Sequence, residues 1–270
     1  MLICFYGQFR SSPRTWLSIQ EHLIFANAAD AAIVTESSDT IPQYARGMFR
    51  YVWRMPVVTL YSWNEVENGD AVVKLLRSAA HVFPAYAFGG SRGSGTFIWA
   101  SFLHAYRKMY RLDYSTFVMT RTDFHYLCPF LIAPTDNCMQ CASIENYGGI
   151  NDRHLVIPRR YLGILRVMHE MSRAATLEKG LWCFKCYTER VLLYVSKRLR
   201  IPICHYNMTM FLVRNAGDAV RSRKGTGRNV SCNQETYRVK YRKEFDFSTK
   251  QCNLDCSRGP LKRKNISVSF

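Results

Sequence analysis

Residues 113–124, which read DYSTFVMTRTDF, decide the fold. Their apolar run predicts a buried strand over Ser115–Thr120 that leads directly into Arg121 and Asp123. In open α/β sheets, ligands bind in the crevice at the carboxyl ends of the parallel strands. There an Arg can pair with phosphate oxygens, and an Asp can hold a divalent cation on a diphosphate. The alternative interpretation is a surface salt bridge at the end of a strand.

Strands and helices alternate on both sides of this stretch. Apolar runs predict strands at Leu2–Tyr6, Ala31–Thr35 and Val57–Tyr61, and one or two more over Ile203–Val213. Helical spacing predicts helices over residues 12–27, 42–54, 96–110, 160–175 and 184–200. The alternation predicts an α/β protein with a Rossmann-type, mostly parallel central sheet flanked by helices. After Arg214 this pattern gives way to Gly, Ser and basic residues.

The composition excludes two broad classes of protein. The chain has 270 residues, of which 48% are hydrophobic and 21% charged, a mixture that excludes a disordered chain. No stretch without charged residues approaches the roughly 20 residues that a membrane-spanning helix needs. The first ten residues lack the basic and apolar regions of a signal peptide. We therefore expect a soluble, cytoplasmic protein.

The ten cysteines are too few for a disulfide scaffold. In a reducing compartment we expect most of them to be buried thiols. Two Cys-x-x-Cys pairs, at residues 138–141 and 183–186, leave a structural zinc site as a lesser alternative. In such a compartment no glycosylation would reach the three Asn-x-Ser/Thr sequons, which begin at Asn207, Asn229 and Asn265, so we expect them to be accidental.

The charge is strongly basic, with 37 Lys and Arg against 20 Asp and Glu, or +17. Residues 215–270 hold 13 of these basic and 5 of these acidic residues, or +8. Such a surface predicts an anionic partner: a nucleic acid, a phospholipid or a phosphorylated small molecule. Tyr237, Tyr241 and Phe245 lie among the basic residues, as in nucleic-acid-binding proteins. No nucleic-acid motif accompanies them, so we expect the extension to contact an anionic surface.

Four stretches, in a characteristic order, are spread over residues 2–214: CFYGQFR at 4–10, DYSTFVMTRTD at 113–123, YGGINDR at 147–153, and TERVLL at 188–193 before RIPI at 200–203. They resemble nucleotide-sugar glycosyltransferases of the GT-A type, in particular small soluble transferases encoded by large DNA viruses of algae. The resemblance implies transfer of a sugar from a nucleoside diphosphate sugar to a glycan or glycoprotein acceptor. It suggests a UDP-linked donor carrying xylose or another small sugar.

The resemblance also implies an organisation and a cofactor. It places a GT-A-like domain over residues 1–214, with a donor half over about 1–125, an acceptor half over about 126–214, and a basic extension over 215–270. Where GT-A enzymes usually carry Asp-x-Asp, this chain has Arg121-Thr-Asp123. Asp123 is therefore the candidate ligand for Mn²⁺ or Mg²⁺, and Arg121 can replace part of the cation's charge. Inactive relatives exist, so a GT-A-like assembly protein is an alternative function.

On the donor side, the candidates lie at or just after the ends of the first two strands. Gly7 can let the backbone approach a ligand, although it can also be an ordinary turn glycine. The amide of Gln8 can bind a nucleobase or ribose, and Arg10 can pair with a diphosphate. Thr35 is the last residue of the second strand. Together with Arg121 and Asp123, these residues form the predicted donor-binding set.

On the acceptor side, Tyr147 can stack on a sugar, and Gly148 and Gly149 can let the sugar approach the backbone. Asp152 is the first candidate for the general base that deprotonates the acceptor hydroxyl, with Arg153 beside it. A helix cap or an Asp–Arg pair is the alternative. Glu189 is the second candidate base, although a solvated or structural role is common for a Glu on a helix.

Overall fold

The computed structural model describes residues 1–6, 13–34, 102–133, 135–144, 146–168, 188–213, 228–232 and 235–254, apart from residues 104 and 108. Several predictions lie outside these residues. They are the helix over residues 42–54, the strand over Val57–Tyr61, the second Cys-x-x-Cys pair, and the donor residues Gly7, Gln8, Arg10 and Thr35.

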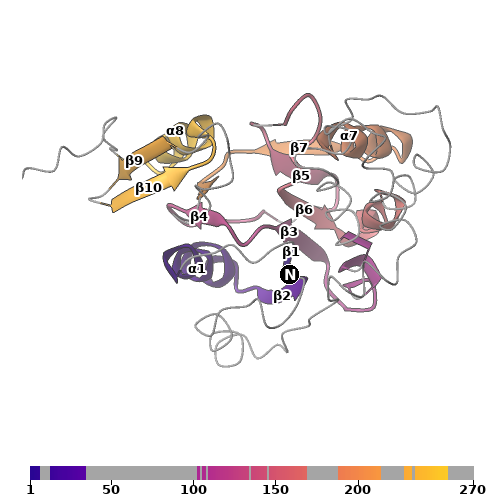
Figure 1. The fold of residues 1–270 in the computed structure, drawn as a ribbon. Coiled ribbons are helices and arrows are strands. Elements are labelled where there is room, and N and C mark those ends of the chain that lie inside the picture. Colours follow the sequence, from indigo (N-terminus) through magenta and orange to yellow (C-terminus); the bar gives the residue numbers. More distant parts are fainter. Residues whose placement is uncertain are drawn as a thin grey trace, which may run out of the picture.

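A six-stranded sheet in the order β2-β1-β3-β6-β5-β7 forms the centre of the fold (Figure 1). Its strands are β1 (Leu2–Tyr6), β2 (Asp30–Val34), β3 (Thr116–Thr120), β5 (Met139–Ala142), β6 (His154–Pro158) and β7 (Ile203–Tyr206). The pairs β1–β2, β1–β3 and β5–β7 are parallel, and β6 is antiparallel to both of its neighbours. The predicted α/β class with a mostly parallel central sheet is confirmed.

Helices cover both faces of this sheet, which is why its central strands are apolar throughout. In β1, Leu2, Cys4 and Tyr6 face one core, and Ile3 and Phe5 face the other. The first core is closed by helical residues between 102 and 109, by residues 164–168 after the 3-10 turn η4 (Arg159–Tyr161), and by α7 (Thr188–Arg198). The second is closed by α1 (Pro13–Ile19) and its continuation η1 (Gln20–Ile24), after which the 3-10 turn η2 (Phe25–Asn27) leads into β2.

A smaller unit lies beside the central sheet. The short strands β4 (Phe124–Tyr126) and β8 (Met210–Leu212) pair antiparallel, as do β9 (Arg228–Cys232) and β10 (Glu235–Val239). The helix α8 (Arg242–Gln251) packs on β8, where the Ser248 hydroxyl donates to the Met210 carbonyl at 2.8 Å. The backbone N–H of Lys240 also donates to the Leu212 carbonyl at 2.9 Å. The described part of the basic extension is therefore fastened to β8.

The cysteines differ from the expectation of buried thiols. Cys128 is bonded to Cys252 and Cys138 to Cys204, and Cys232 is also in a disulfide. Cys138 therefore cannot serve a zinc site with Cys141. Among the described cysteines only Cys4 and Cys141 are free, and both are buried. Spacing along the sequence could not show these pairings because they join segments that are 124 and 66 residues apart.

No helix in the described part of the chain is both long and apolar enough to cross a membrane.

Candidate active site at the edge of the sheet

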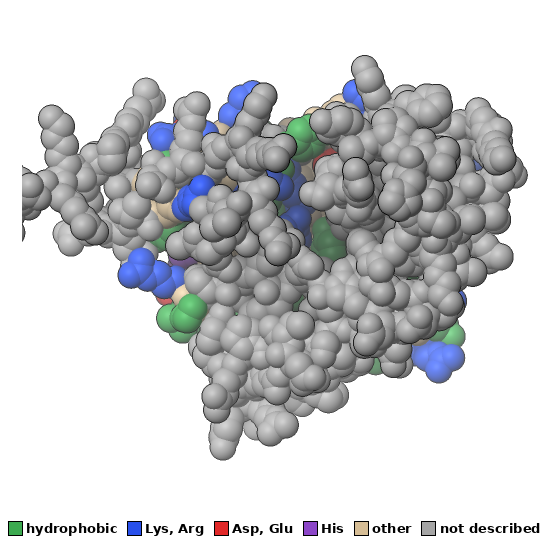
Figure 2. Space-filling model, in the orientation of Figure 1, with side chains coloured by type: hydrophobic (Ala, Val, Ile, Leu, Met, Phe, Trp, Pro, Cys, Tyr) green, Lys and Arg blue, Asp and Glu red, His purple; other side chains and the backbone are tan. Residues whose placement is uncertain are grey.

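Strand register brings the predicted site residues to one edge of the central sheet. Phe5 of β1 lies opposite Thr120 of β3, and Thr120 lies opposite His154 of β6. Because β1 and β3 are parallel and β6 is antiparallel, the residues that follow β1 and β3 meet those that precede β6. The edge therefore gathers Tyr6, Arg121, Asp123, Asp152 and Arg153. Figure 2 shows Lys and Arg side chains inside a hollow near the middle of this face of the molecule.

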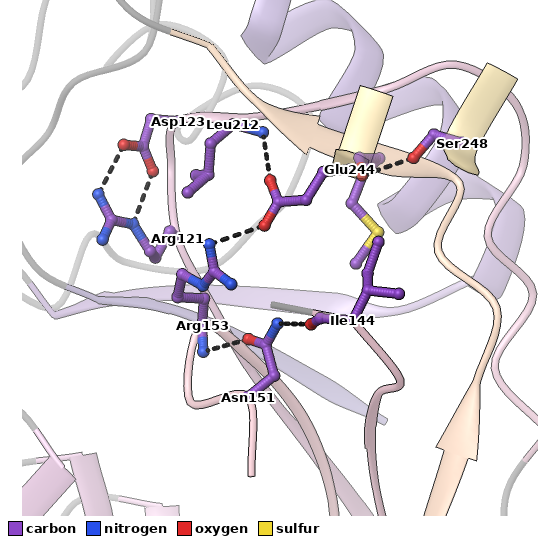
Figure 3. Close-up of polar contacts among 9 residues, drawn as sticks. Arg121, Asp123, Ile144, Asn151, Arg153, Leu212, Glu244 and Ser248 are labelled. Carbon is purple, nitrogen blue, oxygen red and sulfur yellow. Dashed lines mark hydrogen bonds and ion pairs between the residues drawn. The ribbon is translucent and has the colours of Figure 1, made fainter. Parts of the chain in front are cut away.

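Arg121 and Asp123 form a bidentate ion pair just after β3 (Figure 3). Nε of Arg121 donates to Oδ1 of Asp123 at 2.8 Å, and Nη2 donates to Oδ2 at 2.6 Å. Burial alone would lower the pKa of Arg121, but the carboxylate of Asp123 outweighs burial and raises it. The side chain of Arg121 is 22% exposed, and Nη1 takes no part in the pair. Asp123 thus aligns a permanent cation and leaves its Nη1 donors for a further ligand.

Asp152 lies on the loop that enters β6 and is tied to the end of β1. The hydroxyl of Tyr6 donates to the backbone carbonyl of Asp152 at 2.6 Å. Burial raises the pKa of the Asp152 carboxyl, against the opposing charges of Arg153 and Arg121. The carboxyl of Asp152 is thus a buried acid whose charge depends on the two guanidinium groups near it.

Glu189 stands in the first turn of α7, which packs closely against the loop before Asp152. The N–H of Ile150 donates to the carbonyl of Glu189 at 2.9 Å. A Cβ added to Gly149 would lie 2.0 Å from that same carbonyl oxygen, so only a glycine fits between loop and helix. Burial first, and then the charge of Asp152, raise the pKa of Glu189 to about 7. The two candidate bases are therefore close enough for the charge of one to shift the pKa of the other.

The turn that carries Tyr147 has a left-handed backbone. Tyr147 has φ 47° and Gly148 has φ 79°, and the guanidinium Nε of Arg190 donates to the Tyr147 carbonyl at 3.3 Å. The tyrosine is 41% exposed, and its ring lies 6.4 Å from the ring of Tyr241. An exposed ring of this kind suits the predicted stacking on a sugar. The glycine at 149, by contrast, serves packing against α7, because protein backbone fills the space beside it.

Arg153 is buried and held by the C-terminal helix. Its Nη1 lies 2.7 Å from Oε1 of Glu244 (Figure 3). Its guanidinium lies 4.7 Å from the centre of the Tyr241 ring. The other carboxylate oxygen of Glu244 accepts the N–H of Leu212 at 3.2 Å. The side chains of Arg153 and Glu244 are 5% and 0% exposed. Arg153 thus joins the site to α8.

The extension also contributes charge to the site, which the sequence analysis missed. Burial raises the pKa values of Asp152 and Glu189, and the ammonium group of Lys240 acts against this effect on both. The helical spacing of Tyr241, Phe245 and Ser248 was a signal for α8. Nothing in the sequence marked Glu244 as a buried partner of Arg153.

The aromatic residues of the extension belong to the core. Phe245 is 1% exposed and packs on Phe211 at 5.0 Å between ring centres. The ring of Tyr237 lies 4.7 Å from that of His125. The interleaved aromatic and basic residues therefore give no support to nucleic-acid binding, because packing within the protein engages these rings.

The described residues do not form a ready cation site. Arg121 engages both carboxylate oxygens of Asp123. No group of three or more His, Cys, Asp and Glu side chains in this part of the chain could hold a metal ion. A cation at Asp123 would have to displace Arg121, so we derive no step through a metal.

No protein-family model and no curated protein matches the sequence. Among solved structures, the chain is similar to the apo form of the glycosyltransferase GlyE from Streptococcus pneumoniae TIGR4, with a TM-score of 0.40 and 11% identity over 76% of this chain and 44% of that one. It is also similar to mouse xyloside xylosyltransferase 1 in its apo form, with a TM-score of 0.39 and 9% identity over 77% of this chain and 85% of that one. The chain thus spans less than half of the pneumococcal protein. At such TM-scores the likeness carries no functional argument.

Proposed function

We propose that the protein is a glycosyltransferase that moves a sugar from a nucleoside diphosphate sugar to a hydroxyl group of an acceptor glycan. One observation carries the proposal. Three charged groups interact at the end of the sheet where ligands bind in such folds. Arg121 is a cation aligned by Asp123, and the carboxyls of Asp152 and Glu189 both have raised pKa values. Sugar transfer needs a cation and a base, because the leaving diphosphate gains charge while the acceptor hydroxyl loses a proton.

On the donor side, Arg121 binds the diphosphate through Nη1 while Asp123 fixes its orientation. Such a fixed cation stabilises the charge that develops on the leaving group without having to reorganise. Arg10, which follows β1 in the sequence and lies outside the described residues, would add a second cation. A divalent cation at Asp123 is a separate proposal, since it requires Asp123 to exchange Arg121 for the metal.

On the acceptor side, Glu189 takes the proton. A pKa of about 7 keeps a fraction of its carboxyl groups both ionised and basic at neutral pH. The acceptor oxygen forms a bond to the anomeric carbon, the bond from that carbon to the diphosphate breaks, and the diphosphate keeps the electron pair. Asp152, which is more deeply buried, tunes the pKa of Glu189 through its charge. A single displacement of this kind inverts the anomeric centre.

Donor hydrolysis across a panel of nucleotide sugars tests this proposal, starting with UDP-xylose and other UDP-sugars. We expect hydrolysis of at least one donor by the wild type and a strong loss in Arg121→Ala. Arg160→Ala is the matched control: it removes the same charge from an exposed residue just after β6, at the opposite edge of the sheet. A folded wild type that hydrolyses and binds none of the donors would favour a GT-A-like assembly protein.

A further inference from the structure

The disulfides mark a chain that matures under oxidising conditions. Five described cysteines are disulfide-bonded: Cys128, Cys138, Cys204, Cys232 and Cys252. Cys204 is exposed and lies on β7, at the end of the strand order, whereas its partner Cys138 is buried. Disulfides persist in secretory compartments, whereas cytosolic glutathione and thioredoxin keep thiols reduced. The expectation that nothing could glycosylate the sequons therefore loses its basis.

One sequon lies on the surface beside this disulfide. Asn207, Met208 and Thr209 connect β7 to β8, three residues after Cys204. Asn207 is exposed, while Met208 is fully buried and anchors the connection. Asn-x-Ser/Thr with x other than Pro is the acceptor sequence for N-glycosylation, which requires a surface position.

The hydroxyl of Thr209 gives an independent indication. Its Oγ1 is buried, and no hydrogen-bond partner for it is present in the part of the chain that the structure describes. Burying a hydroxyl without a partner costs free energy, and a Val of the same shape would avoid this cost. The described residues thus give no structural reason for a Thr at this position. Recognition of the sequon requires the hydroxyl and therefore does give a reason for a Thr at position 209.

We infer that Asn207 is an N-glycosylation site when the chain folds in the oxidising secretory pathway. The co-reactant is an oligosaccharide linked to a lipid diphosphate. Nδ2 of Asn207 forms a bond to the first carbon of the oligosaccharide, the bond from that carbon to the lipid diphosphate breaks, and the amide loses one proton. The inference is independent of the proposed transferase activity.

The structure favours Asn207 over the other two sequons. Asn229 lies within β9, where it pairs opposite Arg238 of β10, so its backbone is held in a ladder. Asn265 lies outside the described residues. Asn207 instead lies on a connection between strands, the kind of segment on which such acceptors occur.

The test uses the full chain, secreted from yeast behind an added leader. The secreted protein is treated with peptide N-glycosidase in ¹⁸O-labelled water, and the peptide containing residue 207 is analysed by mass spectrometry. We expect labelled Asp at position 207, and a fall in the mass of the intact protein on treatment. Alkylation without reduction should leave the five cysteines named above unmodified.

Two substitutions at one position make the test specific. Thr209→Val keeps the shape of the side chain and breaks no hydrogen bond of the described residues, and it should abolish labelling at Asn207. Thr209→Ser keeps the hydroxyl and should retain labelling. Asn229→Gln and Asn265→Gln should leave labelling at 207 unchanged. A secreted, folded wild type with its disulfides formed and an unlabelled Asn207 would overturn the inference.

Discussion

At the scale of single residues, Asp123 and Arg121 show how one short motif can supply a positioned cation. Arg121 is charged at any pH, so the fold needs to fix only its orientation. The two hydrogen bonds from Nε and Nη2 to Asp123 do so, and both residues sit within three positions of the end of β3. The position of the motif at the end of β3 could be predicted because strand, Arg and Asp are contiguous, and the ion pair itself is the alternative that the sequence left open.

Glu189 gives the first prediction, which concerns pH. Because its carboxylate must be ionised to accept a proton, we expect kcat/KM for transfer to rise with pH through about 7. Glu189→Gln should lower transfer by roughly 10²–10⁴-fold and remove this rise. Asp152→Asn should keep the rise but move it to lower pH, because it removes a charge that raises the pKa of Glu189. The values for the wild type and both variants are measured from the rate of product formation at a saturating concentration of donor.

The same group makes stability depend on pH in a defined direction. The pKa of Glu189 is higher in the folded state than its ordinary value of 4.5, so the folded protein binds more protons between pH 4.5 and about 7. Its contribution to stability is complete below pH 4.5 and is lost as the pH rises through about 7. In urea unfolding, the stability of Glu189→Gln should not show this loss.

The two carboxyl variants also decide which group is the base. If Asp152→Asn abolishes transfer while Glu189→Gln leaves it intact, Asp152 is the base.

At the scale of elements, Gly149 sets the distance between the 146–150 loop and α7. Gly149→Ala would place a methyl group 2.0 Å from the Glu189 carbonyl oxygen, so helix or loop must move. We expect a loss of about 1–3 kcal/mol in the free energy of unfolding, with a fall in kcat because Glu189 moves. Gly163→Ala is the control, because a Cβ there meets nothing within 4 Å. Equal stability and activity of both variants would contradict this account of the loop.

The helix α8 provides a second comparison between two ion pairs. Glu244→Ala leaves Arg153 as a buried charge without its carboxylate, and should cost about 3–5 kcal/mol in the free energy of unfolding. Asp246→Ala, on the same helix, breaks only the surface pair with Arg242 and should cost about 0.3–0.5 kcal/mol. Urea unfolding measures both. A cost below 1 kcal/mol for Glu244→Ala would mean that Arg153 does not depend on α8.

At the scale of the whole molecule, the pattern of apolar residues predicted individual strands and helices. The strands β1, β2, β3 and β7 and the helices α1 and α7 lie where the apolar patterns placed them. In β1 and β3 every residue is buried. The strands β4, β5, β6, β9 and β10 were not predicted. All five residues of β6 are buried, but the polar residues Asp152 and Arg153 directly precede this short run.

The remaining features depend on contacts between distant segments. Disulfides, the Arg153–Glu244 pair and the fit of Gly149 against Glu189 all join parts of the chain that no local pattern connects. For the same reason the sequence named Asp152 and Glu189 as separate candidates and could not show that one raises the pKa of the other. The roles of Gly7, Gln8, Arg10 and Thr35 remain predictions.

The central claim is that Arg121, aligned by Asp123, binds the diphosphate of the donor. Titration calorimetry with UDP and with GDP, in Mn²⁺ and then in chelator, measures it directly on the wild type, Arg121→Ala, Asp123→Ala and the control Arg160→Ala. We expect Arg121→Ala to weaken binding roughly 10- to 100-fold in both conditions, as for the loss of hydrogen bonds to a charged group, while Arg160→Ala binds like the wild type. Asp123→Ala should weaken binding in chelator as well, because Arg121 loses its alignment. Equal affinity of the wild type and Arg121→Ala for both nucleotides in both conditions would contradict the account.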